Sequence, residues 1–93
     1  MNITVTCKKK DISCVITSLE CEGYRISSAP ASLYVDNITE ATPYSIYGDR
    51  SDLDERAGAE FDALHKGGWF KFPPIITSCL IVDDKGGCVR WPA

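Results

Sequence analysis

The 93-residue sequence lacks the long apolar run that a membrane segment would need, and its first residues do not predict an export leader. Its uninterrupted apolar runs extend over a few residues, whereas a transmembrane helix requires about 20. The first residues, MNITVTCKKK, do not show the order of basic and then apolar residues that marks a secretion signal. We therefore expect a cytoplasmic protein that does not act in a membrane.

The sequence also lacks the close cysteine pairs of a zinc site. Its five cysteines are Cys7, Cys14, Cys21, Cys79 and Cys88, an odd number without a C-x-x-C pair. This pattern favours reduced, mostly buried thiols over a disulfide framework. The seven-residue spacing of the first three has no structural meaning on strands, because seven is not a multiple of the strand period of two. We expect no metal and no cofactor.

Catalytic candidates are few. His65 is the only histidine, and a thiol enzyme would have to combine it with Cys79 or Cys88. A histidine near the end of a predicted helix is sufficiently explained by its favourable interaction with the negative end of the helix. Neither the adjacent acids nor the paired glycines have the spacing of a catalytic dyad or a phosphate-binding loop. We predict that the protein is not an enzyme.

The composition is that of a folded chain, with 44% apolar and 25% charged residues. A chain of this length has room for one hydrophobic core, so residues 1–93 are expected to form a single domain. Apolar alternation predicts strands over residues 2–7 and 12–18, joined by the lysine run as a hairpin, and a third strand over residues 24–28. Ile3, Val5 and Cys7 share one face of the first strand.

Residues 28–47 contain two prolines and weak periodicity, which predicts a long loop with a short edge strand at residues 33–35. A helix is predicted from about Asp52 to Lys66, with Ser51 as its cap and Gly67-Gly68 at its end. Residues 75–82 and 88–91 then form a C-terminal hairpin. The expected fold is α+β: an antiparallel sheet of four to five strands with one main helix packed on one face.

Charge is distributed unevenly along the chain. Residues 36–62 contain eight acids and two bases, whereas the segments before and after them carry a small net positive charge. Three tyrosines lie in or next to the acidic segment, and tyrosine anchors within an acidic surface suit docking onto a basic protein groove. The residues predicted to contact a partner are Asp36, Glu40, Tyr44, Tyr47, Asp49, Asp52, Asp54 and Glu55. A solvated helix face that only maintains solubility explains the same charges equally well.

In its small size, compactness and charge pattern the chain resembles the phage-encoded inhibitors of bacterial defence, among them the small anti-CRISPR proteins. The resemblance includes no shared motif. It implies a non-enzymatic inhibitor in the host cytoplasm that occupies a Lys- and Arg-rich surface of a Cas ribonucleoprotein complex and blocks its access to DNA. We adopt inhibition by protein–protein contact as the leading hypothesis.

Nucleic-acid binding is the alternative hypothesis. It would use Lys8, Lys9 and Lys10 together with the aromatic and lysine side chains between Trp69 and Phe72, in particular Trp69 and Lys71. The net charge of −3 argues against it, because nucleic-acid binders usually present a broad basic stripe.

Overall fold

The computed structural model describes residues 1–28, 43–52, 54–70 and 76–92. In chain order its elements are β1 (Asn2–Lys8), the 3₁₀ helix η1 (Lys9–Asp11), α1 (Ile12–Cys21), β2 (Arg25–Ser28), β3 (Pro43–Asp49), α2 (Ala57–Lys66), β4 (Ile76–Val82) and β5 (Cys88–Trp91). The strands form one antiparallel sheet in the order β2-β3-β1-β4-β5, so β1 is central. The first six regular elements follow the split β-α-β-β-α-β order, which β5 extends by one strand.

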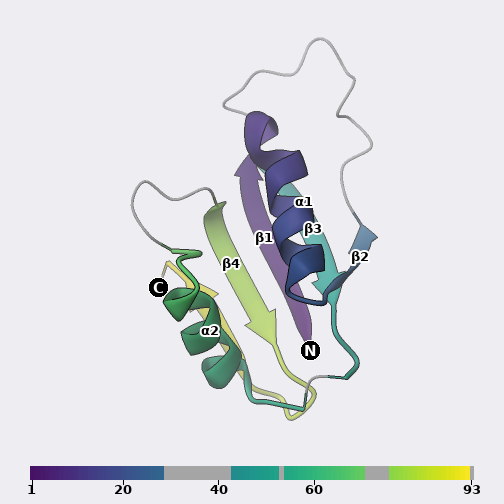
Figure 1. The fold of residues 1–93 in the computed structure, drawn as a ribbon. Coiled ribbons are helices and arrows are strands. Elements are labelled where there is room, and N and C mark those ends of the chain that lie inside the picture. Colours follow the sequence, from purple (N-terminus) through teal and green to yellow (C-terminus); the bar gives the residue numbers. More distant parts are fainter. Residues whose placement is uncertain (29–42, 53, 71–75, 93) are drawn as a thin grey trace.

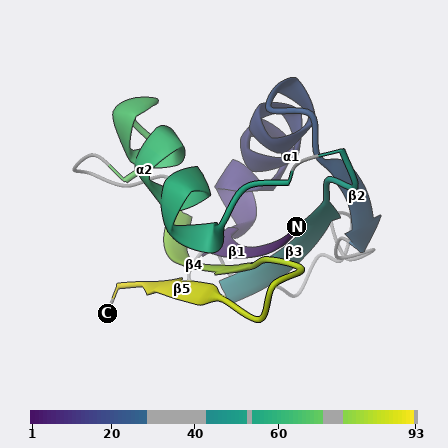
Figure 2. The same ribbon diagram turned by 90° about the horizontal axis from the view of Figure 1, so that it is seen from below.

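Both helices lie on the same face of the sheet, and the opposite face carries neither of them (Figures 1 and 2). The predicted α+β class with an antiparallel sheet is thus confirmed, although the sheet is covered by two helices of ten residues each. None of the helices in the described ranges has the length and apolar character needed to cross a membrane.

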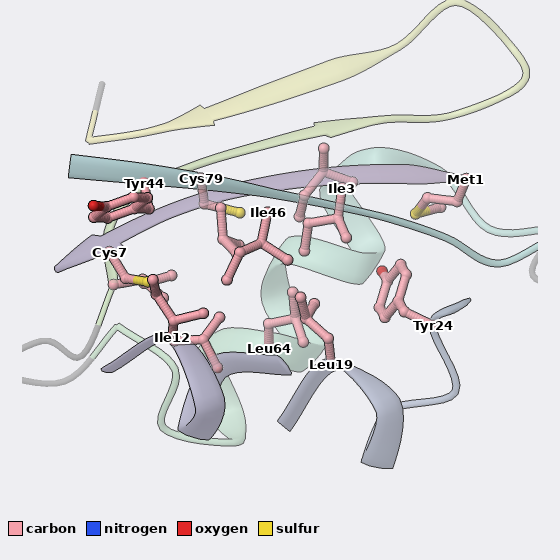
Figure 3. Packing of buried hydrophobic residues seen from close by; sticks show 14 of the residues in the cluster. Met1, Ile3, Cys7, Ile12, Leu19, Tyr24, Tyr44, Ile46, Leu64 and Cys79 are labelled. Carbon is pink, nitrogen blue, oxygen red and sulfur yellow. The ribbon is translucent and has the colours of Figure 1, made fainter. Parts of the chain in front are cut away.

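The core lies between the sheet and the two helices (Figure 3). The predicted first strand is confirmed as β1, and its side chains alternate between the core and the other face. Ile3, Val5 and Cys7 point into the core and are at most 1% exposed. Ile12 and Leu19 from α1 and Leu64 from α2 pack against them as members of the same cluster.

The second predicted strand, residues 12–18, is wrong, because this segment belongs to helix α1. Its β-branched residues and the alternation of Ile12, Cys14 and Ile16 suggested a strand. However, Ile12, Val15, Ile16 and Leu19 also follow the helical spacing i, i+3, i+4 and i+7, and this is the set that faces the core. The expected hairpin of the first two segments therefore does not form, and β1 pairs with β3 and β4.

Both helices end at a glycine with a positive φ. Gly23 (φ 92°) follows α1 and Gly68 (φ 86°) follows α2, a backbone conformation that glycine adopts without a steric penalty. The next residue in each case donates its backbone N–H to the carbonyl five positions back: Tyr24 to Leu19 at 3.0 Å and Trp69 to Leu64 at 3.1 Å. The predicted end of the second helix is thus confirmed.

The third predicted strand is confirmed as β2, but the predicted loop over residues 28–47 is wrong in its last part. Pro43–Asp49 forms β3, which lies between β2 and β1 near the centre of the sheet. Proline has no backbone N–H to donate. Because proline is the first residue of β3, only the end of the ladder lacks a donor, and the pairing with β1 continues through the rest of the strand. The edge strand expected at residues 33–35 lies outside the described residues.

Helix α2 begins at Ala57, five residues later than predicted, and Ser51 lies in a turn. The side chain of its N-cap residue, Arg56, makes no capping hydrogen bond. The cap comes instead from the turn between β4 and β5, where the Asp83 carboxylate accepts the backbone N–H of Ala57 at 2.7 Å. The same carboxylate accepts the N–H groups of Lys85 and Gly87, each at 2.8 Å. The C-terminal hairpin predicted from the sequence is therefore confirmed, and its turn also holds the start of α2.

Candidate functional site

The sheet face that carries no helix is formed by short polar side chains around a few large ones. We call it the open face and assign to it, by strand alternation and register, Asn2, Thr4, Thr6, Lys8, Arg25, Ser45, Tyr47, Asp49, Ser78, Leu80, Val82, Cys88 and Arg90. The neighbouring positions on the same strands, such as Val5, Ile46 and Ile81, fill the core on the other side. The face therefore runs across β2, β3, β1, β4 and β5.

The apolar centre of the open face lies on one row of paired residues. Thr4 of β1 is paired with Tyr47 of β3 and with Leu80 of β4. In the next row Asn2 is paired with Val82. Tyr47 is 44% exposed and Val82 is 36% exposed, and these are the two exposed large hydrophobic side chains in the described part of the chain. Val82 and Leu80 lie two residues apart on β4, and Tyr47 lies across Thr4 of β1 from Leu80, so these apolar side chains share one face with short polar side chains between them.

Two arginines lie toward the opposite edges of this face. Arg90 of β5 is paired with Leu80, at the end of the row that contains Tyr47. On the other side Arg25 of β2 forms an ion pair with Asp49 at 3.6 Å, and its side chain is 83% exposed. Tyrosine and arginine are the residue types that most often carry binding energy in protein interfaces. An apolar centre with a polar rim is the usual anatomy of such an interface.

The acidic surface predicted from the sequence is divided by the fold. Tyr47 and Asp49 lie on the open face, whereas Asp52, Asp54 and Glu55 are exposed in the segment between β3 and α2. Tyr44 is 8% exposed and points into the core near Cys7 (Figure 3), so its predicted role as a surface anchor is corrected. Asp36 and Glu40 lie outside the described residues.

Three of the predicted aspartates have basic partners. Asp49 pairs with Arg25 at 3.6 Å, Asp52 with Arg50 at 3.6 Å, and Asp54 with Lys85 at 3.4 Å. Exposed pairs of this kind contribute little to stability, but the opposite charges reduce the field of the carboxylates. The described part of the acidic segment therefore presents a mixed-charge surface.

The lysines of the predicted nucleic-acid site lie at the end of β1 that is distant from Asn2 and Val82. Lys8 closes that strand, and Lys9 and Lys10 form η1, close to the start of β4, where Cys7 is paired with Ile76. Trp69 follows α2, is half-buried and packs against the core cluster. Lys71 and Phe72 lie outside the described residues. The lysine run thus has no exposed aromatic platform from Trp69 beside it.

The cysteines divide into two groups, which corrects the expectation that most are buried. Cys7 and Cys79 are buried, and Cys14, Cys21 and Cys88 are exposed. Burial raises the pKa of the Cys79 thiol to about 12 and that of Cys7 to about 11, with further contributions from Glu60 and Asp11, respectively. Neither buried thiol is a nucleophile at neutral pH, because the thiolate is the reactive form.

A buried polar group that sequence reasoning missed lies between the helices. Glu60 of α2 is 4% exposed and accepts a hydrogen bond of 3.0 Å from the Tyr24 hydroxyl. Burial raises the pKa of Glu60. Burial and the nearby charge of Glu60 both raise the pKa of Tyr24. The Arg50 guanidinium lies 5.6 Å from the centre of the Tyr24 ring. The sequence signal that could have revealed this burial is the position of Glu60, which follows Ala57 by three residues and therefore lies on the apolar stripe of α2.

This buried group has the features of a structural link rather than a reaction centre. The Tyr24 hydroxyl joins the end of α1 to α2, and both members of the hydrogen bond are buried. His65 is exposed in the last turn of α2 and contacts Phe61 and Phe70, with ring centroids 6.3 and 6.0 Å away. Across the described ranges no three His, Cys, Asp or Glu side chains are grouped as metal ligands.

Comparison with known proteins finds no matching family model, no similar curated protein and no similar solved structure. The case for a function therefore depends on the residues and their geometry.

Proposed function

We propose that the protein acts without catalysis, by binding a partner protein through the open face. The observation that carries this proposal is that Tyr47 and Val82, the two exposed large hydrophobics of the described chain, both lie by register on the sheet face that carries neither helix. Leu80 extends the same patch and Arg90 borders it. Burying such a centre beneath a partner removes apolar surface from water, which contributes roughly 25 cal/mol per Å² before the costs of association.

A protein partner fits this face better than a nucleic acid. Bases bind by stacking on aromatic rings, and Tyr47 is the aromatic residue among those assigned to the open face, while Leu80 and Val82 are aliphatic. The net charge of −3 also opposes the approach of a polyanion. The three basic residues of the face, Lys8, Arg25 and Arg90, are too few to form a track for a phosphate backbone, and Arg25 already pairs with Asp49.

The finer proposal concerns the class of partner. The resemblance to anti-CRISPR proteins in size, compactness and charge pattern supports an RNA-guided complex whose DNA-binding surface this chain would occupy, with the open face rather than the charge-paired acidic segment supplying most of the contact. The consequence is stoichiometric inhibition: DNA binding by such a complex should fall in proportion to added protein until one chain is bound per site. A gel-shift titration of a purified complex with its DNA target measures this directly.

The coarser proposal is tested with variants of the open face. Tyr47→Ala and Val82→Thr change the apolar centre, while Asp62→Ala removes an exposed side chain of α2 on the other side of the sheet. Each chain is tagged, produced in its native host, and captured with its bound partner after nuclease treatment. Loss of a central tyrosine anchor should weaken binding about 30-fold, corresponding to roughly 2 kcal/mol, and the Asp62 variant should bind as the wild type does.

Equal recovery of the partner with all three variants would contradict the proposal. Loss of the partner from the wild-type protein on nuclease treatment would show that nucleic acid mediates the association, which would also contradict the proposal. Circular dichroism of each variant checks that the fold is unchanged.

A further inference from the structure

Two exposed cysteines lie on the outward surface of α1. Cys14 and Cys21 are both free and exposed, in contrast to the buried Cys7 of β1. Seven residues correspond to nearly two helical turns, so the two thiols lie on the same side of the helix, about 10.5 Å apart along its axis. The seven-residue spacing, meaningless on a strand, therefore places these cysteines in line once the segment is helical.

The side chains around the two thiols are small and uncharged. Between them lie Thr17, which is exposed, and Ser18, which is half-buried, and Ser13 precedes Cys14. The charges lie at the two ends of the helix. Lys9, Lys10 and the N-cap Asp11 precede its first residue and together carry one net positive charge, whereas Glu20 and Glu22 lie at its C-terminus. Such a helix is complementary to an antiparallel copy of itself, because the basic end of each copy meets the acidic end of the other and the helix dipoles oppose.

We propose that α1 is an interface with a second copy of this chain, and that Cys14 of each copy forms a disulfide with Cys21 of the other. The two helices run antiparallel about a two-fold axis that passes between Thr17 and Ser18. That axis places position 14 opposite position 21 twice, so two equivalent disulfides form. Homotypic bonds are excluded in this arrangement, because the two copies of Cys21 are separated by about 10.5 Å along the helices.

The distances agree with ordinary helix packing. Helices pack with their axes about 8 to 10 Å apart, and their Cα atoms lie about 2.3 Å from each axis. At the upper end of that range directly facing Cα atoms are about 5.4 Å apart, within the roughly 4.4 to 6.8 Å that a disulfide requires. The short side chains of Ser13, Thr17 and Ser18 allow this approach without displacing the helix backbone.

The bonds form by exchange with a small disulfide such as oxidised glutathione. The Cys14 thiolate attacks the glutathione disulfide, forming a mixed disulfide and releasing one glutathione. The Cys21 thiolate of the other copy then attacks the Cys14 sulfur and releases the second glutathione. Each interchain bond thus consumes two protein thiols and one oxidised glutathione and yields two reduced glutathiones. The dimer leaves the open face free, because α1 lies on the other side of the sheet (Figure 2).

The test uses the full chain in oxidised glutathione, with covalent dimers measured by non-reducing electrophoresis and molar mass by light scattering. Wild-type protein should form a dimer that returns to monomer with dithiothreitol. Cys14→Ser alone and Cys21→Ser alone should form none. An equimolar mixture of the two should form a dimer with one chain of each, joined by the remaining Cys14 and Cys21. The matched control is Cys88→Ser, another exposed cysteine, which should dimerise as the wild type does.

The mixture distinguishes the proposed pairing from incidental oxidation. A covalent dimer formed by either single variant alone at the wild-type level would overturn the proposal, because it would show a homotypic bond. A mixture that stays monomeric, or a dimer that disappears with Cys88→Ser, would overturn it as well. Partner binding through the open face is scored separately, so the failure of one proposal leaves the other unaffected.

Discussion

Glu60 is the titratable residue of α2 that faces the core, where its partner is the hydroxyl of Tyr24. The carboxylate loses hydration on burial, and one hydrogen bond together with the nearby Arg50 charge does not restore the loss, so its pKa is raised. A raised pKa means that the folded state binds the proton more tightly than the unfolded chain does. The contribution of Glu60 to stability is therefore fully present below its unfolded pKa of about 4.3 and is lost as pH rises through its folded value.

Glu60→Gln should accordingly stabilise the protein at neutral pH. The amide oxygen can still accept the Tyr24 hydroxyl proton, and the buried charge is gone. Thermal unfolding at pH 7 should show a higher Tm than wild type, and the difference should shrink as pH falls below about 4, because the wild-type carboxyl then becomes protonated in both states. A Tm difference that is independent of pH would show that the effect does not come from ionisation. Asp62→Asn, an exposed carboxyl on the same helix, is the control.

Substitution by alanine should have opposite effects on stability at two of the glycines. Gly23 has a φ of 92°, and a Cβ there would lie 3.3 Å from Nε of Arg50, so Gly23→Ala should destabilise by roughly 1 kcal/mol. Gly58 lies in the first turns of α2 with no atom within 4 Å of an added Cβ, so Gly58→Ala should stabilise by roughly 0.5 to 1 kcal/mol. Urea denaturation of the two variants measures the change in the free energy of unfolding and therefore its sign in each case.

At the scale of elements, the fold depends on one side chain that lies far from the element it stabilises. The Asp83 carboxylate belongs to the turn between β4 and β5, yet it accepts the first backbone N–H of α2. Its three backbone hydrogen bonds lower its pKa, although burial opposes the shift. This contribution to stability is present above the unfolded pKa of about 3.9 and is lost as pH falls through the lower folded value.

Asp83→Ala should therefore lower the Tm by roughly 4 to 8 °C near pH 7, because it removes the cap of α2 and the acceptor for two turn N–H groups. Asp84→Ala is the matched control. Asp84 is adjacent, its side chain is 76% exposed, and its ion pair with the N-terminal amine is 3.6 Å long. Equal Tm values for the two variants, measured by calorimetry, would show that the cap is not needed.

The elements also show which parts of the fold the sequence could reveal. β1 and the C-terminal hairpin were predictable because their apolar residues alternate or their turn is rich in glycine and aspartate. α1 was mistaken for a strand because Ile12 and Ile16 fit both periods, and only packing against the sheet decides between them. The start of α2 was not predictable locally, since its cap is supplied by a residue 26 positions away.

At the scale of the whole molecule, the two sides of the sheet have different roles. One side carries α1 and α2 (Figure 2) and contains the core. By register, the other carries a tyrosine, aliphatic side chains and short hydroxyls. The sequence pointed to Tyr47 and Asp49 as contact residues, and the fold places both on the open face. It could not reveal Leu80, Val82 and Arg90 as their neighbours, because that depends on the pairing of β1 with β3 and β4.

Charge is expected to have a smaller role in partner binding than the acidic segment first suggested. Three of its aspartates lie beside basic groups, and these pairs weaken their field. Glu55→Lys should slow association at low salt, with an effect that shrinks above about 0.15 M salt, and should change the affinity less than Tyr47→Ala does. Association rates at several salt concentrations, measured by surface plasmon resonance against the captured partner, test this ranking.

The central claim, that a protein partner binds the open face, is tested most directly by photocrosslinking in cells. A photoreactive phenylalanine derivative replaces Tyr47 in one chain and Ala63, exposed on α2, in another. We predict one discrete, nuclease-resistant adduct with a second protein from position 47 and none from position 63. Equal adducts from both positions, or none from position 47, would contradict the claim.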